Sequence, residues 1–150
     1  MIQKVEKLKE IINQNSMGHL PLAYRVDFMK QIGDTRTVQK VFMFSITSSK
    51  GDIITLNTRN TDKICNAFRN IRELMYNKNS KQSAWFQIEM FLKSKAQYIL
   101  KFNYDNLEQI PSFFQKPDWL LEMFREYPRS KEYTPLWLRE IVGRRKLYLT

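Results

Sequence analysis

Residues 85–108 read WFQIEMFLKSKAQYILKFNYDNLE, and this stretch decides the fold class. Two runs rich in aromatic and β-branched residues, 85–92 and 97–104, flank the short polar connection 93–96. Alternating side chains on either side of a short polar turn are typical of a β-hairpin. We expect one face to be buried, carrying Phe86, Ile88, Met90 and Leu92 beside Tyr98, Leu100, Phe102 and Tyr104, or the opposite register for one strand. The other face would carry Gln87, Glu89, Lys101 and Asn103.

Three further strands are expected earlier in the chain. Segments 22–29 and 38–46 alternate or are rich in β-branched and aromatic residues, and Gly33-Asp34 between them reads as a hairpin connection. A second tight turn at 48–52 then leads into a shorter run, 52–57. The sequence therefore predicts three strands in succession before the hairpin.

Two helices accompany these strands. Residues 2–14 place apolar side chains at three- and four-residue spacing, which indicates an amphipathic helix. A second helix has its apolar face at Ile64, Phe68, Ile71 and Met75. Asn60 or Thr61 can cap its first turn.

The last third of the chain is punctuated by prolines and predicts two short helices. One covers 119–127, with Asp118 as its cap after Pro117. The other covers 136–145, begins near Pro135 and stops at Gly143.

The order α-β-β-β-α-β-β-α-α groups hairpins between helices, which favours an α+β fold over a parallel α/β fold. We expect an antiparallel five-stranded sheet with helices packed mainly on one face. No composition break marks a boundary, so residues 1–150 are expected to form a single domain with a helical C-terminal extension from about residue 111.

The net charge of +10 favours an acidic partner, although it does not choose among a protein, a nucleic acid and an anionic membrane surface. The N-terminus lacks the apolar core of a secretory signal, and no stretch approaches the ~20 apolar residues that span a bilayer. We therefore expect a cytoplasmic protein that does not enter a membrane.

The residues that usually carry chemistry are isolated in this sequence. His19 is the only histidine and lies in a Gly-His-Leu-Pro turn, and Cys65 is the only cysteine and falls on the apolar side of a helix. Carboxylate pairs such as Glu122 with Glu126 share one helix face, which is more typical of a solvated surface. No phosphate-binding or nucleophile motif is present. We expect no catalytic residue, metal or cofactor; an enzyme with an unfamiliar site would need a deep pocket with convergent polar groups.

The polar end of the last strand is the candidate partner-binding site. Exposed polar residues between aromatic anchors are typical of interface hot spots. The candidate residues are Lys101, Asn103, Tyr104, Asp105, Arg125 and Arg129. The alternative is structural: Tyr104 is then a rim or core aromatic, and Asp105 caps the turn that follows.

Basic residues interleaved with tyrosines also suggest an RNA- or DNA-binding module, through phosphate contacts and base stacking. No RNA-recognition signature appears in 97–104, and the charges are spread over the whole chain.

The order of the segments resembles the YezG-like family of bacterial immunity proteins. In that family a long helix precedes a strand opened by a Trp, a hairpin, and a lysine-aromatic strand that ends in a Tyr-Asp or Tyr-Glu pair. Matching features here are Trp85, the 93–96 turn, Lys101-Phe102, and Tyr104-Asp105 with Leu107. The resemblance covers residues 2–108.

The resemblance implies an immunity protein that binds and neutralises a cognate toxin domain, of the polymorphic or contact-dependent type used in bacterial competition, by blocking its active site. Two features depart from the family: the chain is strongly basic where members are mostly acidic, and its C-terminal segment extends beyond their usual end. We therefore expect a toxin with an acidic binding face.

Overall fold

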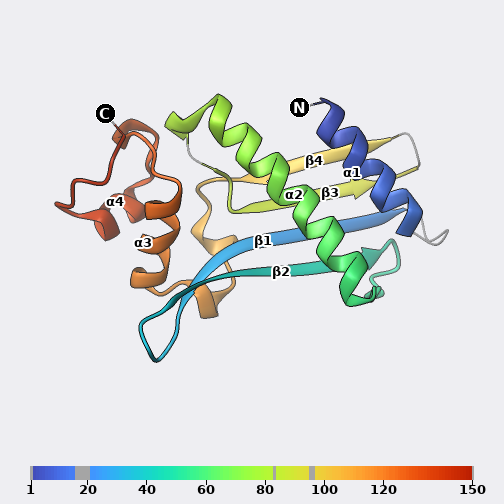
Figure 1. Ribbon diagram of the computed structural model, residues 1–150, viewed down its shortest axis with the longest axis horizontal. Coiled ribbons are helices and arrows are strands. Elements are labelled where there is room, and N and C mark those ends of the chain that lie inside the picture. Colours follow the sequence, from blue (N-terminus) through green and yellow to red (C-terminus); the bar gives the residue numbers. More distant parts are fainter. Residues whose placement is uncertain (1, 16–20, 83, 95–96, 150) are drawn as a thin grey trace.

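The computed structural model describes residues 2–15, 21–82, 84–94 and 97–149 (Figure 1). Helices and strands follow one another as α1 (Ile2–Asn15), β1 (Leu22–Ile32), β2 (Val38–Ser48), α2 (Thr58–Lys78), β3 (Gln87–Leu92), β4 (Tyr98–Asn103), α3 (Pro117–Glu126) and α4 (Leu136–Val142). Short 3-10 turns lie at Ser80–Gln82, Leu107–Gln109, Ser112–Phe114 and Lys131–Tyr133. This mixture of helices and strands confirms the α+β class.

The sheet has four strands within the described residues, in the order β2-β1-β3-β4, and every neighbouring pair is antiparallel. The expected fifth strand at 52–57 is wrong. Ile53 forms only an isolated bridge to Thr47, and Ile54 N donates to Ile46 O at 3.0 Å. After this contact the chain leaves the sheet, because Asn57 already caps α2.

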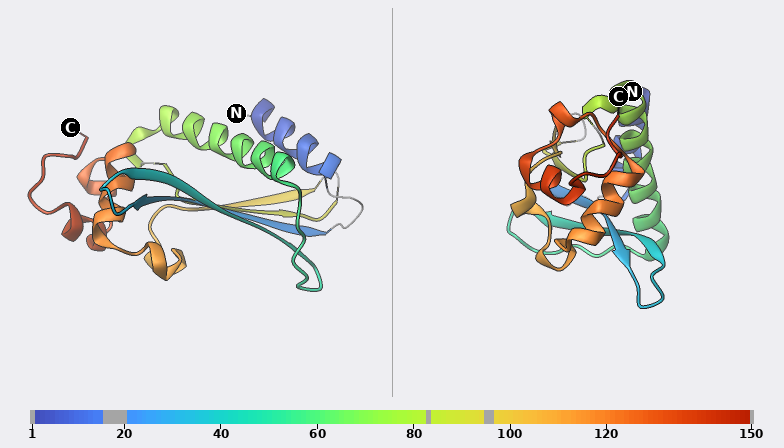
Figure 2. Two further views of the ribbon diagram at one scale, coloured as in Figure 1. Left: turned by 60° about the horizontal axis from the view of Figure 1, so that its bottom comes forward. Right: turned by 90° about the vertical axis from the view of Figure 1, so that its left-hand side faces the viewer.

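The helix-facing side of the sheet holds the main core. Alternation along β1 and β3 buries Tyr24, Val26, Ile88 and Met90 beneath the two long helices. Figure 2 shows α1 and α2 together on this side of the sheet. Val5, Leu8 and Ile12 of α1 and Ile64, Phe68 and Ile71 of α2 are buried here.

The start of β3 departs from the expected alternation. Gln87 is the register partner of Asn103, yet Phe86 N also donates to Asn103 O, at 3.0 Å. Phe86 and Gln87 therefore both oppose Asn103, which is a β-bulge. The bulge shifts the alternation by one residue, so Trp85 and Ile88 both reach the main core. Phe86, expected on the same face as Ile88, instead joins a second apolar cluster with Met29.

The C-terminal region packs at one end of the sheet, around α3 and α4 (Figures 1 and 2). Trp119 and Leu120 of α3 and Phe114 of the preceding turn bury Met29 and Phe86. The predicted helical extension is thus built onto the sheet through a second core. A third small cluster joins α3 to α4.

Helix ends differ in detail from those expected. Asn57, not Asn60 or Thr61, caps α2: its side chain accepts from Asn60 N at 2.8 Å. Asp118 lies in the first turn of α3 and is not its cap. The predicted stop of α4 at Gly143 is confirmed, with φ of 59° and ψ of −129°, a conformation that strongly favours glycine.

No helix among the described residues is both long and apolar enough to cross a membrane. His19 lies outside the described residues.

Candidate partner-binding surface

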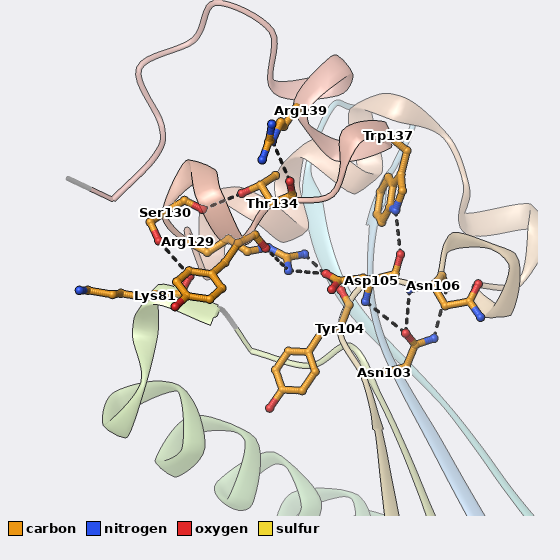
Figure 3. Close-up of polar contacts among 11 residues, drawn as sticks. Lys81, Asn103, Tyr104, Asp105, Asn106, Arg129, Ser130, Thr134, Trp137 and Arg139 are labelled. Atoms are coloured by element: carbon orange, nitrogen blue, oxygen red, sulfur yellow. Dashed lines mark hydrogen bonds and ion pairs between the residues drawn. The ribbon is translucent and has the colours of Figure 1, made fainter.

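The Tyr104–Asp105 end of β4 is held by one buried arginine (Figure 3). Arg129, only 4% exposed, donates from Nη1 to Asp105 Oδ1 at 2.7 Å and to Tyr133 O at 3.1 Å. Its Nη2 donates to Tyr104 O at 3.1 Å. Burial lowers the pKa of Arg129 below its ordinary value, and the hydrogen bond and charge of Asp105 offset part of this shift. The contact joins the end of the strand to the segment after α3.

Two more side chains shape the same corner. Asn103 Oδ1 accepts from the backbone N–H groups of Asp105, at 3.2 Å, and Asn106, at 2.9 Å. Trp137 Nε1 donates to Asp105 O at 2.8 Å (Figure 3). Asn103 therefore folds the turn, a common use of a short amide side chain. Tyr104 packs against the main core. Its pKa is raised, mainly by burial and to a smaller extent by the negative charge of Asp105.

The structure thus brings four of the six predicted residues together: Asn103, Tyr104, Asp105 and Arg129. These four are engaged in contacts within the chain. Lys101 lies earlier on β4 with an exposed side chain, and Arg125 is exposed on α3 near Glu122. The two exposed cations of the predicted set are therefore not part of the corner.

The sheet face opposite α1 and α2 shows a different feature. Register partners on this face form rows across the four strands. The first row is Thr47, Ala23, Phe91 and Ile99, and the second is Ser45, Arg25, Glu89 and Lys101. We call these eight residues the open face. Phe91 is 38% exposed and Ile99 50% exposed, so two large apolar side chains in adjacent strands meet solvent.

A hollow of about 330 Å³ lies on the open face. Its lining includes Ala23, Glu89, Phe91, Ile99 and Lys101. The hollow forms because the small Ala23 side chain sits beside the large Phe91, leaving space above β1. An apolar hollow with charged residues at its margin can receive an apolar side chain from another molecule.

The third row of the sheet marks the boundary of the open face. Asp27, which is buried, accepts from Gln87 Nε2 at 2.6 Å and from Arg25 Nε at 3.2 Å. Arg25 Nη2 also donates to Gln109 O at 2.9 Å. The 3-10 turn at Leu107–Gln109 therefore lies against Arg25 and Gln87 at this end of the outward face, while Phe91 and Ile99 in the first row stay exposed.

The open face could be read from the sequence only in part. The alternation that places Gln87 and Glu89 outward also places Phe91 outward, and Ile99 shares the phase of Lys101. An apolar residue at an outward position was the available signal. Nothing in the sequence showed which end of this face the C-terminal region would cover.

Groups with the potential for chemistry are buried or scattered. Cys65 is fully buried in the main core, and burial raises the pKa of its thiol to about 11, which opposes formation of the reactive thiolate. Across residues 2–15, 21–82, 84–94 and 97–149, no group of three or more His, Cys, Asp or Glu side chains is placed to hold a metal ion.

No protein-family model matches this chain. A search of curated proteins also finds no significant match.

Proposed function

We propose that this protein is an immunity protein that binds a bacterial toxin domain through its open face and thereby blocks the toxin's active site. The observation that carries the proposal is the uncovered pair Phe91 and Ile99 beside the hollow at Ala23. Contiguous apolar surface on a small domain commonly marks an interaction site. The charged row with Arg25, Glu89 and Lys101 supplies a polar margin, as at known protein interfaces.

The charge of the chain supports an acidic partner. A net charge of +10 attracts an oppositely charged protein over a distance and can raise its association rate by about 10- to 1000-fold. Lys101, the predicted site residue on the open face, is the local cation nearest to the edge of the sheet. An apolar anchor on the toxin, flanked by carboxylates, would match this arrangement.

The resemblance to YezG-like immunity proteins also supports the proposal, because it covers the same helix-sheet-helix-hairpin unit that builds the open face. Such a protein would act in the cytoplasm of the producing cell and would require no cofactor.

A protection assay tests the proposal. If the protein is an immunity protein, a large secreted toxin should be encoded next to its gene. The C-terminal domain of that toxin is the partner used in the assay. Cells expressing that domain should survive with the wild-type chain and die with Ile99→Ser. Leu136→Ser is the matched control, because Leu136 is 69% exposed on α4 and is not part of the open face, and it should still protect. Death with the wild-type chain, or protection by Ile99→Ser, would contradict the proposal.

One observation favours the second candidate, an RNA- or DNA-binding module. A groove of about 220 Å³ between α1 and α2 is lined by Lys4, Lys7, Lys63, Asn66 and Asn70, with Ile11 and Ala67. Lysines can contact phosphates and amides can contact bases. Retention on immobilised RNA that weakens steeply with salt would support this function, and no retention at low salt would remove it.

A further inference from the structure

The outer edge of β4 is the starting point for a second inference. β4 is the last strand of the sheet order, and no described segment of the chain pairs with its outer side. Lys93 N donates to Gln97 O at 3.0 Å in the hairpin, and bonded pairs alternate along an antiparallel ladder. Ile99 and Lys101 therefore bond inward to β3. The backbone groups of Tyr98, Leu100 and Phe102 point outward.

The opposite edge of the sheet is less open. On β2, Ile46 O accepts from Ile54 N and Thr47 forms a bridge with Ile53. The chain itself thus covers one end of that edge. β4 also differs in its side chains, because Ile99 continues the apolar row from Phe91 directly to the boundary of the sheet.

We propose that the outer edge of β4 accepts an extended segment of the toxin as a fifth strand. This inference rests on the proposed function and specifies how the partner is bound. Addition of a strand to a free edge satisfies its backbone groups and is a recurrent mode of peptide recognition. It would also extend the open face, placing a partner side chain beside the hollow.

The side chains of β4 specify the chemistry of that segment. Non-hydrogen-bonded neighbours across an antiparallel pair lie closest together, and Ile99 and Lys101 would hold these positions toward the new strand. An apolar residue is therefore expected beside Ile99 and an acidic residue beside Lys101. A second copy of this chain fits less well, because β4 contains no carboxylate to place beside Lys101.

Edge protection is the competing explanation. Short edge strands that carry a lysine discourage unwanted pairing, and β4 has six residues and one lysine. Ile99 does not fit that explanation, because a half-exposed isoleucine next to the edge promotes association. The combination of an apolar row and a single cation favours an edge that pairs with one specific strand over an edge that is protected from all pairing.

Amide hydrogen exchange, measured by NMR on the free chain and on its complex with the toxin's C-terminal domain, tests the inference. The amides of Tyr98, Leu100 and Phe102 should exchange about tenfold or more slowly in the complex. The amides of Phe42 and Phe44 on the outer edge of β2 are the controls and should not change. A complex that protects none of the three β4 amides would overturn the inference and leave the proposed function standing.

Two charge reversals make the test residue-specific. Lys101→Glu should weaken binding about tenfold or more, because it faces the expected acidic neighbour. Lys93→Glu makes the same charge change at the exposed hairpin turn and should have about a threefold effect or less. Equal losses for both would overturn edge pairing in favour of general attraction. Protection of the β4 amides in a dimer of the free chain would show that the occupant is a second copy, and failure to bind the toxin domain at all would overturn both proposals.

Discussion

At the scale of single residues, two buried arginines organise the C-terminal half of the molecule. Arg72 donates from Nε to Trp85 O at 2.6 Å and stacks against Phe28 and Tyr127. Arg129 is held by Asp105 and two carbonyls. A buried charge is tolerated when it is paired and hydrogen-bonded, and both terminal nitrogens of Arg129 are bonded although its Nε has no partner among the described residues. These contacts fix where the C-terminal region sits on the sheet.

Replacement of Arg129 by Leu should therefore destabilise the protein by about 3 kcal/mol, because the Tyr104 and Tyr133 carbonyls lose their donor and Asp105 loses its partner. Urea unfolding measures this change. Arg125→Leu is the matched control: Arg125 is exposed on α3, and its loss should cost about 0.5 kcal/mol or less. Equal stability of the two variants would show that the buried network contributes nothing.

Glu126 makes folding stability depend on pH. Its Oε2 accepts from Lys30 Nζ at 2.6 Å and lies 3.1 Å from Lys40 Nζ, while Oε1 lies 3.7 Å from Arg72 Nη1. Burial raises the pKa of Glu126, but the hydrogen bonds from Lys30 and Lys40 outweigh burial and leave the pKa below its ordinary value. A lowered folded-state pKa stabilises the fold above the unfolded-state value of about 4.3.

The stabilisation by Glu126 should be complete at neutral pH and should be lost as the pH falls below about 4.3 and through the lower folded-state pKa. Glu126→Gln should lower the free energy of unfolding by about 2 kcal/mol at neutral pH. The difference between wild type and variant should shrink in acid. Thermal melts of both proteins across this range provide the test, and a difference that is constant with pH would exclude the ion pairs as its source.

At the scale of elements, the sequence predicted periodic segments well and boundaries less well. The hairpin of β3 and β4 was predictable because one face of each strand is apolar and the other carries the polar residues Gln87, Glu89, Lys101 and Asn103. Segment 52–57 has the composition of a strand, but its pairing with β2 ends at Ile54. Whether a segment pairs depends on the whole sheet and cannot be read from its own residues. The cap of α2 was misplaced by three residues because Asn57 and Asn60 are both competent caps.

Asn57→Ala tests the assignment of the α2 cap. The variant should lose about 1 kcal/mol of stability, because Asn60 N would lose its acceptor at the first turn. Asn60→Ala, the cap position expected from sequence, should have a smaller effect. Thermal unfolding of both variants measures the two losses of stability. A larger loss for Asn60→Ala would contradict Asn57 as the cap and favour Asn60, the cap expected from the sequence.

At the scale of the whole molecule, burial is distributed unequally over the two faces of the sheet. α1 and α2 cover one face completely enough to bury Tyr24, Ile88 and Met90, while the C-terminal region closes only one end of the other. The exposed remainder carries the apolar row that we propose binds the toxin. Of the candidate site, sequence identified Lys101 correctly as an outward cation. Arg129 could not be recognised as an internal contact, because its partners Asp105 and Tyr104 lie 24 and 25 residues away in the sequence. Asn103 bonds to the turn that directly follows it, which is a common role for an Asn at the end of a strand.

The central claim is tested most directly by the dissociation constant between the purified chain and the toxin's C-terminal domain, with Phe91→Asp as the variant. A charge at an interface anchor should cost about 2 kcal/mol or more, so the dissociation constant should rise about 30-fold or more while the melting temperature is retained. Leu136→Asp, at a 69%-exposed apolar position on α4, should bind like the wild type. Undiminished affinity of a folded Phe91→Asp variant would contradict the assignment of the open face as the binding surface.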